Sequence, residues 1–176
     1  MEANILLWIQ ENLRADALTP IVKGITFLGD AGWIWILCTL VMLCMRKTRR
    51  IGCCTGAALV YDLLCVNVLA KNLFARTRPY TDIPELVNLI GPQSDYSFPS
   101  GHTAASFAFA VAFCMLAPKK YSIPVFVLAT LISLSRLYVG VHYPTDVLGG
   151  AMIGAVCGVL AVVTVKAIEK RCKKTA

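Results

Sequence analysis

Hydrophobic residues run along this chain in five long stretches that are separated by short polar segments. The stretches cover Ala31–Met45, Ile51–Leu69, Gly101–Ala117, Ser122–Leu134 and Val147–Val165. A helix needs about 20 apolar residues to cross the hydrocarbon of a bilayer. The first and fourth stretches reach that length only with flanking residues. We therefore predict an all-α, polytopic membrane helical bundle, with about five transmembrane helices between residues 31 and 168.

Residues 1–28 follow a different pattern. Apolar residues recur at helical spacing among charged ones, at Ile5, Leu6, Ile9, Leu13 and Ala17. This spacing is typical of an amphipathic helix that lies on the membrane surface, where Trp8 suits the interface. A helix that packs over the bundle explains the same pattern equally well. The segment lacks the basic start and apolar centre of a secretory signal peptide.

Composition and charge agree with a membrane protein. Hydrophobic residues make up 57% of the 176 residues, and the mean hydropathy is +0.68. Eleven of the 17 lysines and arginines lie in three clusters, at 46–50, 119–120 and 166–174. In a five-helix topology these clusters share one side of the membrane, and basic loops stay in the cytoplasm.

The charge pattern therefore orients the predicted bundle. A basic tail over residues 169–176 is expected in the cytoplasm, while residues 75–99 and the turn near His142 are expected outside. The net charge of +7 follows from this topology and gives no reason to expect a nucleic-acid partner. The chain shows no repeat or linker, so one domain over residues 1–176 is the simplest organisation.

Side chains suited to chemistry gather at the outer ends of the predicted helices, in three stretches. In the first, KNLFARTRPY, Lys71 and Arg78 are seven residues apart, which places both on one face of a helix that Pro79 ends. Two such cations can bind an anion. The alternative is a pair of basic side chains that reach up to lipid headgroups, and Arg76 fits that alternative better.

The second stretch is PSGH, directly before an apolar run. Ser100 can cap the helix that follows, with Gly101 and His102 in its first turn. The free N–H groups and the dipole of a helix start favour an anion, and Gly101 lets that anion approach the backbone. His102 adds a proton donor. A capped helix with an incidental histidine is an equal alternative.

The third stretch, SRLYVGVHYPTD, contains the second of the two histidines in the chain. Arg136 lies near the outer end of the fourth predicted helix, and His142 lies in the turn that follows. Pro144 suits the first turn of the fifth helix, with Asp146 just inside it. A carboxylate beside a histidine fixes its tautomer and raises its basicity, which makes a nucleophile. The alternative is a turn histidine next to a capping aspartate.

Together the three stretches favour a phosphate site. Three cations close to lipid are costly unless they share an anionic ligand. In phosphoryl transfer, cations and backbone N–H groups hold the phosphate oxygens, while one histidine attacks phosphorus and the other protonates the leaving oxygen. The sequence has no acidic cluster of the kind that holds magnesium, so neither a metal nor another cofactor is expected.

The same three stretches resemble the three-part signature of the type 2 phosphatidic acid phosphatase (PAP2) superfamily. The match runs from Lys71 to Asp146 and includes residue types, spacing and order. The resemblance implies a metal-independent phosphatase that acts through a phosphohistidine, with His142 as nucleophile, Asp146 as its orienting partner and His102 as general acid. It implies that phosphate is bound by Lys71, Arg78, Ser100, Gly101 and Arg136. Vanadium-dependent haloperoxidases share the signature, but they are larger and soluble.

Within the superfamily the chain resembles small bacterial enzymes that act on undecaprenyl diphosphate, phosphatidylglycerophosphate or related lipid phosphates. We expect a multi-pass lipid phosphatase or diphosphatase of the cell membrane, active at its outer face. Hydrolysis of phosphatidylglycerophosphate or phosphatidate is one alternative. A non-catalytic membrane protein that binds lipid phosphates is another, but such a protein would need neither His142 nor Asp146.

Two features inside the apolar stretches carry structural expectations. Gly150, Gly154 and Gly158 form a stripe of small residues, which predicts close helix contact inside the bundle. Asp62 lies in the middle of a predicted span, where a hydrogen bond to a neighbouring helix is the favoured role.

Overall fold

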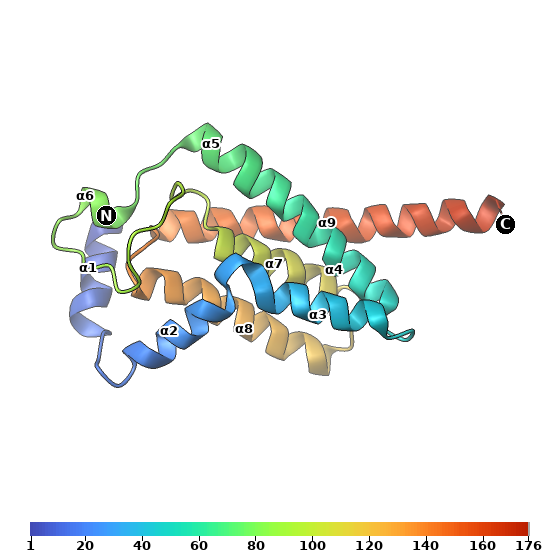
Figure 1. Cartoon of the computed structure of the whole chain (residues 1–176), viewed down its shortest axis with the longest axis horizontal. Helices are drawn as coiled ribbons and strands as arrows, with labels where there is room; N and C mark the ends of the chain where they lie inside the picture. Colours follow the sequence, from blue (N-terminus) through green and yellow to red (C-terminus); the bar gives the residue numbers. More distant parts are fainter. Residues whose placement is uncertain (176) are drawn as a thin grey trace.

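The computed structural model describes residues 1–175, and its regular elements are helices (Figure 1). In chain order they are α1 (Glu2–Asn12), α2 (Thr19–Leu28), η1 (Asp30–Gly32), α3 (Trp33–Cys44), α4 (Arg49–Asp62), η2 (Leu63–Ala70), α5 (Lys71–Phe74), α6 (Pro79–Asp82), α7 (Gly101–Cys114), α8 (Lys119–Tyr138) and α9 (Pro144–Thr175). The predicted all-α bundle is confirmed. Ala176, the last residue of the predicted tail, lies outside the described residues.

Fewer helices than five have the length of a complete membrane span. Three stretches in residues 1–175 are long and apolar enough, at Arg49–Asp82, Lys119–Tyr138 and Pro144–Lys174. The helices α2 and α3 qualify only as a pair that is bent by 44°. With 14 residues, α7 is about 21 Å long, short of the roughly 30 Å of bilayer hydrocarbon. The predicted count of five spans is therefore not confirmed.

The bend between α2 and α3 lies at Gly29–Gly32. Ala31 and Gly32 have φ values of 49° and 66°, in the left-handed region, so the helix cannot continue through them. Residues 19–28 were predicted to belong to an interfacial N-terminal region, and they form α2. This helix packs against α8 and leads into α3. The bend places Asp30 beside the first turn of α7.

The first helix packs over the bundle, which is one of the two alternatives considered for it. Leu6 is fully buried against Ile83, Leu86 and Tyr143, whereas Trp8 is 55% exposed. The prediction of a helix that continues to Ala17 is wrong, since α1 ends at Asn12. Directly after that end, the Arg14 side chain donates hydrogen bonds to the carbonyl oxygens of Tyr138 and Val87, at 2.9 and 2.8 Å. These bonds tie the chain to the bundle.

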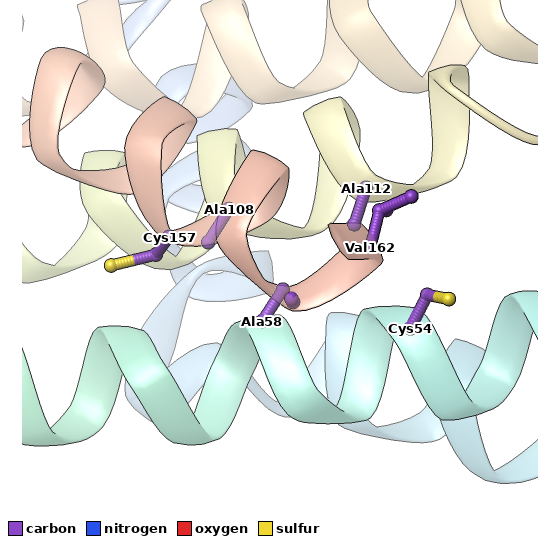
Figure 2. Close-up of a cluster of buried hydrophobic side chains, with 7 residues drawn as sticks. Cys54, Ala58, Ala108, Ala112, Cys157 and Val162 are labelled. Atoms are coloured by element: carbon purple, nitrogen blue, oxygen red, sulfur yellow. The ribbon is translucent and has the colours of Figure 1, made fainter. Parts of the chain in front are cut away.

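The centre of the bundle is the contact between α7 and α9, with α4 against both. Small side chains from these three helices meet in one core cluster: Cys54, Ala58, Ala108, Ala112, Cys157, Ala161 and Val162 (Figure 2). A Cβ atom on Gly154 would lie 2.2 Å from the carbonyl oxygen of Ala104. The predicted glycine stripe is therefore a close helix contact inside the bundle.

The two ends of the bundle differ in charge. The connections 45–48 and 115–118 lie at one end, toward which α9 also runs before it extends past the other helices (Figure 1). There Arg50 of α4 pairs with Glu169 of α9 at 3.0 Å. The opposite end carries α1, α5, α6 and the start of α7. The predicted basic clusters thus share one end, opposite the candidate site.

Candidate functional site

The structure brings the residues of the three signature stretches together at the end opposite the basic connections. Lys71, Arg78, Ser100, Arg136, His142 and Asp146 are all less than 10% exposed. Backbone contact joins two of the stretches directly, because the amide of Ser100 donates to the carbonyl oxygen of Asp146 at 3.0 Å. The starts of α7 and α9 therefore lie side by side, and the packing of the two helices fixes that arrangement.

The cations Lys71 and Arg78 meet, although not in the predicted way. The helix ends after Phe74, because Ala75 adopts a left-handed conformation with φ 42°. Arg78 follows in an extended conformation as the N-cap of α6, which begins at Pro79. The prediction that both cations project from one helix face is therefore wrong. The turn at Ala75 still returns Arg78 to the side of Lys71.

Asp95 bridges these two cations. Its Oδ2 pairs with Lys71 Nζ, and its Oδ1 accepts a hydrogen bond of 2.5 Å from Arg78 Nη2. Partial burial raises the pKa of Asp95, but Lys71 and Arg78 outweigh it and hold that pKa below its usual value. The carboxylate is 46% exposed, so an anion arriving from solvent can reach the same two cations.

His142 lies in the turn between α8 and α9 and is buried between a cation and a carboxylate. Its Nε2 lies 3.0 Å from Arg78 Nη1, and its Nδ1 lies 3.4 Å from Asp146 Oδ2. A guanidinium only donates hydrogen bonds, so Nε2 must carry the lone pair and Nδ1 the proton. The tautomer set by these contacts directs the Nε2 lone pair at the cation cluster, where it accepts a hydrogen bond from Arg78 Nη1.

The charge state of His142 follows from its burial. Burial lowers the pKa of His142 to about 3, and Arg78 acts in the same direction while Asp146 opposes both. The ring is therefore neutral at physiological pH, as a nucleophile requires.

Asp146 is held on three sides. Its Oδ2 accepts hydrogen bonds from Ser97 Oγ at 2.5 Å and from the amide of Tyr143 at 2.8 Å, and its Oδ1 accepts one from Arg76 Nη1 at 2.7 Å. Arg76 pairs with Glu2 of α1 as well, also at 2.7 Å. The interpretation of Arg76 as a headgroup contact is thus wrong, because this arginine holds the carboxylate that faces His142.

The start of α7 carries the residues of the second signature stretch, PSGH. Ser100 occupies the N-cap position as predicted, but its side chain makes no capping bond and instead accepts a hydrogen bond of 3.1 Å from Thr103 Oγ1. A Cβ atom on Gly101 would lie 3.4 Å from Lys71 Nζ, so the backbone of this turn lies close to the cation. His102, in the same turn, contacts Asp30 at 2.8 Å.

Arg136 completes the cation cluster from α8. It is 1% exposed, and its Nη1 donates to Thr26 Oγ1 of α2 at 2.7 Å. Its Nε is buried and has no hydrogen-bond partner in residues 1–175. A buried guanidinium with an unused donor suits an anionic ligand, since such a group is costly to leave unpaired.

These features match a known family. Residues 51–170 of the chain match the PAP2 superfamily. The chain belongs to this superfamily. The resemblance seen in the sequence is thereby confirmed.

Named relatives and solved structures support the assignment. An undecaprenyl-diphosphatase from Sulfolobus acidocaldarius is 34% identical over 138 residues, which cover 77% of this chain and 66% of that enzyme, just under two thirds. Aquifex aeolicus LpxE has a TM-score of 0.79 at 27% identity, over 92% of this chain and 94% of that one. The transmembrane PAP2 type phosphatidylglycerolphosphate phosphatase from Bacillus subtilis has a TM-score of 0.75 at 28% identity, over 97% and 85%. The chain is a membrane protein with the PAP2 fold.

The site of this PAP2 protein opens into a cleft of about 550 Å³ between α3 and α4. Apolar side chains line it, among them Ile36, Leu40 and Leu59, while Lys71 and His102 also border it. Asp62 lines the same cleft, is 3% exposed, and its Oδ1 has no hydrogen-bond partner in the described chain. The hydrogen bond expected to a neighbouring helix is therefore not formed by that oxygen.

Acidic ligands do not cluster around the site. Within residues 1–175, no three His, Cys, Asp or Glu side chains are grouped so that they could hold a metal ion. Each of the acids at the site instead faces a cation or a histidine: Asp30, Asp95 and Asp146.

Sequence reasoning missed four groups at the site. They are Asp30, Arg76, Asp95 and Ser97. Asp95 and Ser97 lie just before the PSGH stretch and Arg76 lies inside the KNLFARTRPY stretch, so proximity to the signature was an available signal. No such signal marked Asp30, which lies 72 positions from its partner His102.

Proposed function

We propose that this PAP2 protein is an integral membrane lipid phosphatase that acts through a phosphohistidine at His142. The observation that carries the proposal is the buried, neutral ring of His142, with Nε2 at 3.0 Å from Arg78 and Nδ1 facing Asp146. A phosphate that accepts the hydrogen bond of Arg78 in place of Nε2 would release the lone pair of that nitrogen for attack on phosphorus. A protein that only binds lipid phosphates would not need that arrangement.

Hydrolysis would take place in two steps, phosphorylation of His142 and then transfer of the phosphoryl group to water. First, the Nε2 lone pair of His142 forms a bond to phosphorus while the bond from phosphorus to the leaving oxygen breaks, and that oxygen takes a proton from His102. Then His102 takes a proton from water, the water oxygen bonds to phosphorus, and the N–P bond breaks. Inorganic phosphate leaves, and both histidines regain their starting state.

The remaining groups of the site bind the phosphate oxygens. Three buried cations would bind the phosphoryl group: Lys71, Arg78 and Arg136. Gly101 adds a backbone N–H group at the start of α7, where the helix dipole also favours negative charge. Ser100 adds its hydroxyl, because its backbone N–H already donates to the carbonyl oxygen of Asp146. These groups supply positive charge where charge develops in the transition state, so the proposed reaction is independent of a metal.

The proposed substrate is a polyprenyl diphosphate such as undecaprenyl diphosphate. Support comes from the name of the Sulfolobus acidocaldarius relative and from the apolar cleft beside the cations, which suits a hydrocarbon tail. A phospholipid monophosphate, phosphatidylglycerophosphate or phosphatidate, is the second candidate, supported by the name of the Bacillus subtilis structure.

The proposed orientation puts the site at the extracytoplasmic face and the C-terminus in the cytoplasm. The basic connections and the basic end of α9 lie together at the end opposite the site, and such clusters favour the cytoplasmic side. A lipid phosphate would then keep its tail in the bilayer while its headgroup meets the start of α7.

A release assay in detergent tests this function. Phosphate release is measured with a short-chain polyprenyl diphosphate, phosphatidylglycerophosphate and phosphatidate, with and without EDTA, for the wild type and His142→Ala. We expect release from at least one lipid in EDTA and none from the variant. Binding without release would favour the non-catalytic alternative, and activity that is lost in EDTA and restored by magnesium would contradict metal independence.

A further inference from the structure

His102 has a carboxylate partner of its own, Asp30. The Nε2 atom of His102 lies 2.8 Å from Asp30 Oδ1. The histidine is 16% exposed and the aspartate 50%, so the contact lies at the mouth of the site. Asp30 begins η1, in the bend between α2 and α3, whereas His102 is in the first turn of α7. The chain thus contains two histidine–aspartate pairs, and only one of them was visible in its sequence.

Gly29 lies close to the imidazole ring of His102 on another side. A Cβ atom at Gly29 would lie 2.7 Å from His102 Cδ2 and 3.4 Å from its Cγ. Only a residue without a side chain allows this approach. Backbone contact at Cδ2 and the carboxylate at Nε2 together fix one edge of the imidazole. The opposite edge carries Nδ1.

The contacts assign different tasks to the two ring nitrogens. An ionised carboxylate only accepts hydrogen bonds, so Nε2 carries a proton in the pair with Asp30. Nδ1 has no hydrogen-bond partner among the described residues. His102 borders both the apolar cleft that contains Lys71 and a second hollow of about 430 Å³ that contains Asp30. The ring therefore lies between the hollow that contains Asp30 and the cleft that contains Lys71.

We propose that Asp30 is a positioning residue that orients His102 so that its Nδ1 exchanges the proton with the leaving oxygen. This inference rests on the proposed phosphatase function. A carboxylate bound to one nitrogen of an imidazole fixes the tautomer and stabilises the imidazolium that carries the transferable proton. Burial and the cations Arg136 of α8 and Lys71 of α5 disfavour the charged form of this ring, and Asp30 is the group that favours it.

The test compares two leaving groups in Asp30→Asn. An alkyl oxygen, as in phosphatidate, leaves poorly without a proton, whereas nitrophenolate departs unprotonated. General acid catalysis is worth about 10²–10⁴ in rate, so we expect the variant to lose about 10- to 100-fold in kcat/KM on phosphatidate and less than about threefold on nitrophenyl phosphate. Asp16→Asn, at an exposed aspartate, is the matched control and should change neither rate. Equal losses on both substrates, or no loss on either, would overturn the proposal.

A second measurement tests the pair without turnover. In a His142→Gln protein, His102 is the only histidine, so its ¹⁵N NMR signals report one ring. We expect a proton on Nε2 when Asp30 is present and a mixture of tautomers after Asp30→Asn. A ring protonated only on Nδ1 with Asp30 intact would overturn the assignment. If the wild type hydrolyses neither of these substrates nor a short-chain polyprenyl diphosphate while the NMR result holds, the phosphatase function fails and the pairing stands.

Discussion

At the scale of single residues, the environment of His142 determines its chemistry. Burial lowers the pKa of His142 to about 3, although a free histidine has a pKa near 6.5. Below pH 6.5 an ordinary histidine gains a proton and loses its lone pair, whereas His142 keeps its lone pair until the pH approaches 3. The proposed nucleophile therefore stays unprotonated over the whole physiological range.

We expect the ligand-free His142 ring to stay neutral at pH 5, with about one molecule in a hundred protonated. The measurement is a ¹⁵N NMR titration of His102→Asn protein, in which His142 is the only histidine. A titration midpoint near 6.5 would show that the ring is solvated and would contradict the buried geometry.

Asp95 leads to a second expectation at this scale. Its carboxylate already contacts Lys71 and Arg78, so an incoming phosphate has to displace it. Removing the charge in Asp95→Asn should strengthen competitive inhibition by inorganic phosphate about 3- to 10-fold, since this partly exposed contact is of modest strength. Asp16→Asn serves as the control. Unchanged or weaker inhibition would mean that Asp95 organises the cations and does not compete with the ligand.

Residue spacing alone predicts part of this site. His142 and Asp146 are four apart across the start of α9, so a short-range rule was enough to pair them. Lys71 and Arg78 were paired for the wrong reason, because the left-handed turn at Ala75 is not marked by glycine. Asp95 lies in the irregular segment 83–100, whose path no periodic pattern predicts.

At the scale of elements, the contact between α7 and α9 positions the site. Both helices begin with signature residues, and the amide of Ser100 donates to the carbonyl oxygen of Asp146. The glycines of α9 allow this approach, as the 2.2 Å between a Cβ on Gly154 and the Ala104 carbonyl oxygen shows. The packing that stabilises the core thus also sets the distance between the two halves of the site.

We expect Gly154→Ala to lower the thermal unfolding midpoint in detergent and to reduce turnover. Overpacking typically costs about 1–3 kcal/mol, and here the new methyl group meets backbone, which cannot rotate away. Gly24→Ala in α2 is the matched control, because its Cβ would meet nothing within 4 Å. That variant should be neutral or slightly stabilising. Equal midpoints for the two variants would contradict the close contact.

The elements also show where sequence patterns stop being informative. The apolar stretches that begin at Ile51, Ser122 and Val147 each fall within one of the three spans of the structure, Arg49–Asp82, Lys119–Tyr138 and Pro144–Lys174. The bent pair α2–α3 was missed because charged and left-handed positions at Asp30–Gly32 interrupt the apolar pattern. That interruption is the place where the structure positions Asp30 against His102.

At the scale of the whole molecule, charge and chemistry lie at opposite ends. The basic connections and the end of α9 occupy one end, and the starts of α7 and α9 lie toward the other (Figure 1). His102 is in the first turn of α7, and His142 is in the turn before α9. We expect green fluorescent protein fused after Ala176 to fluoresce in cells, and secreted-type alkaline phosphatase at the same position to stay inactive, because the first folds in the cytoplasm and the second needs an oxidising compartment. The reverse result would invert the proposed orientation.

The central claim is a covalent phosphate on His142, and trapping it is the most direct test. In His102→Ala, nitrophenyl phosphate should still phosphorylate His142, since nitrophenolate leaves without a proton, but no group remains to activate water for the second step. We expect a burst of nitrophenolate of about one equivalent, and mass spectrometry after an alkaline quench should find phosphate on the His142 peptide. Phosphate on another residue, or hydrolysis by His102→Ala,His142→Ala at the rate of His102→Ala, would contradict the account.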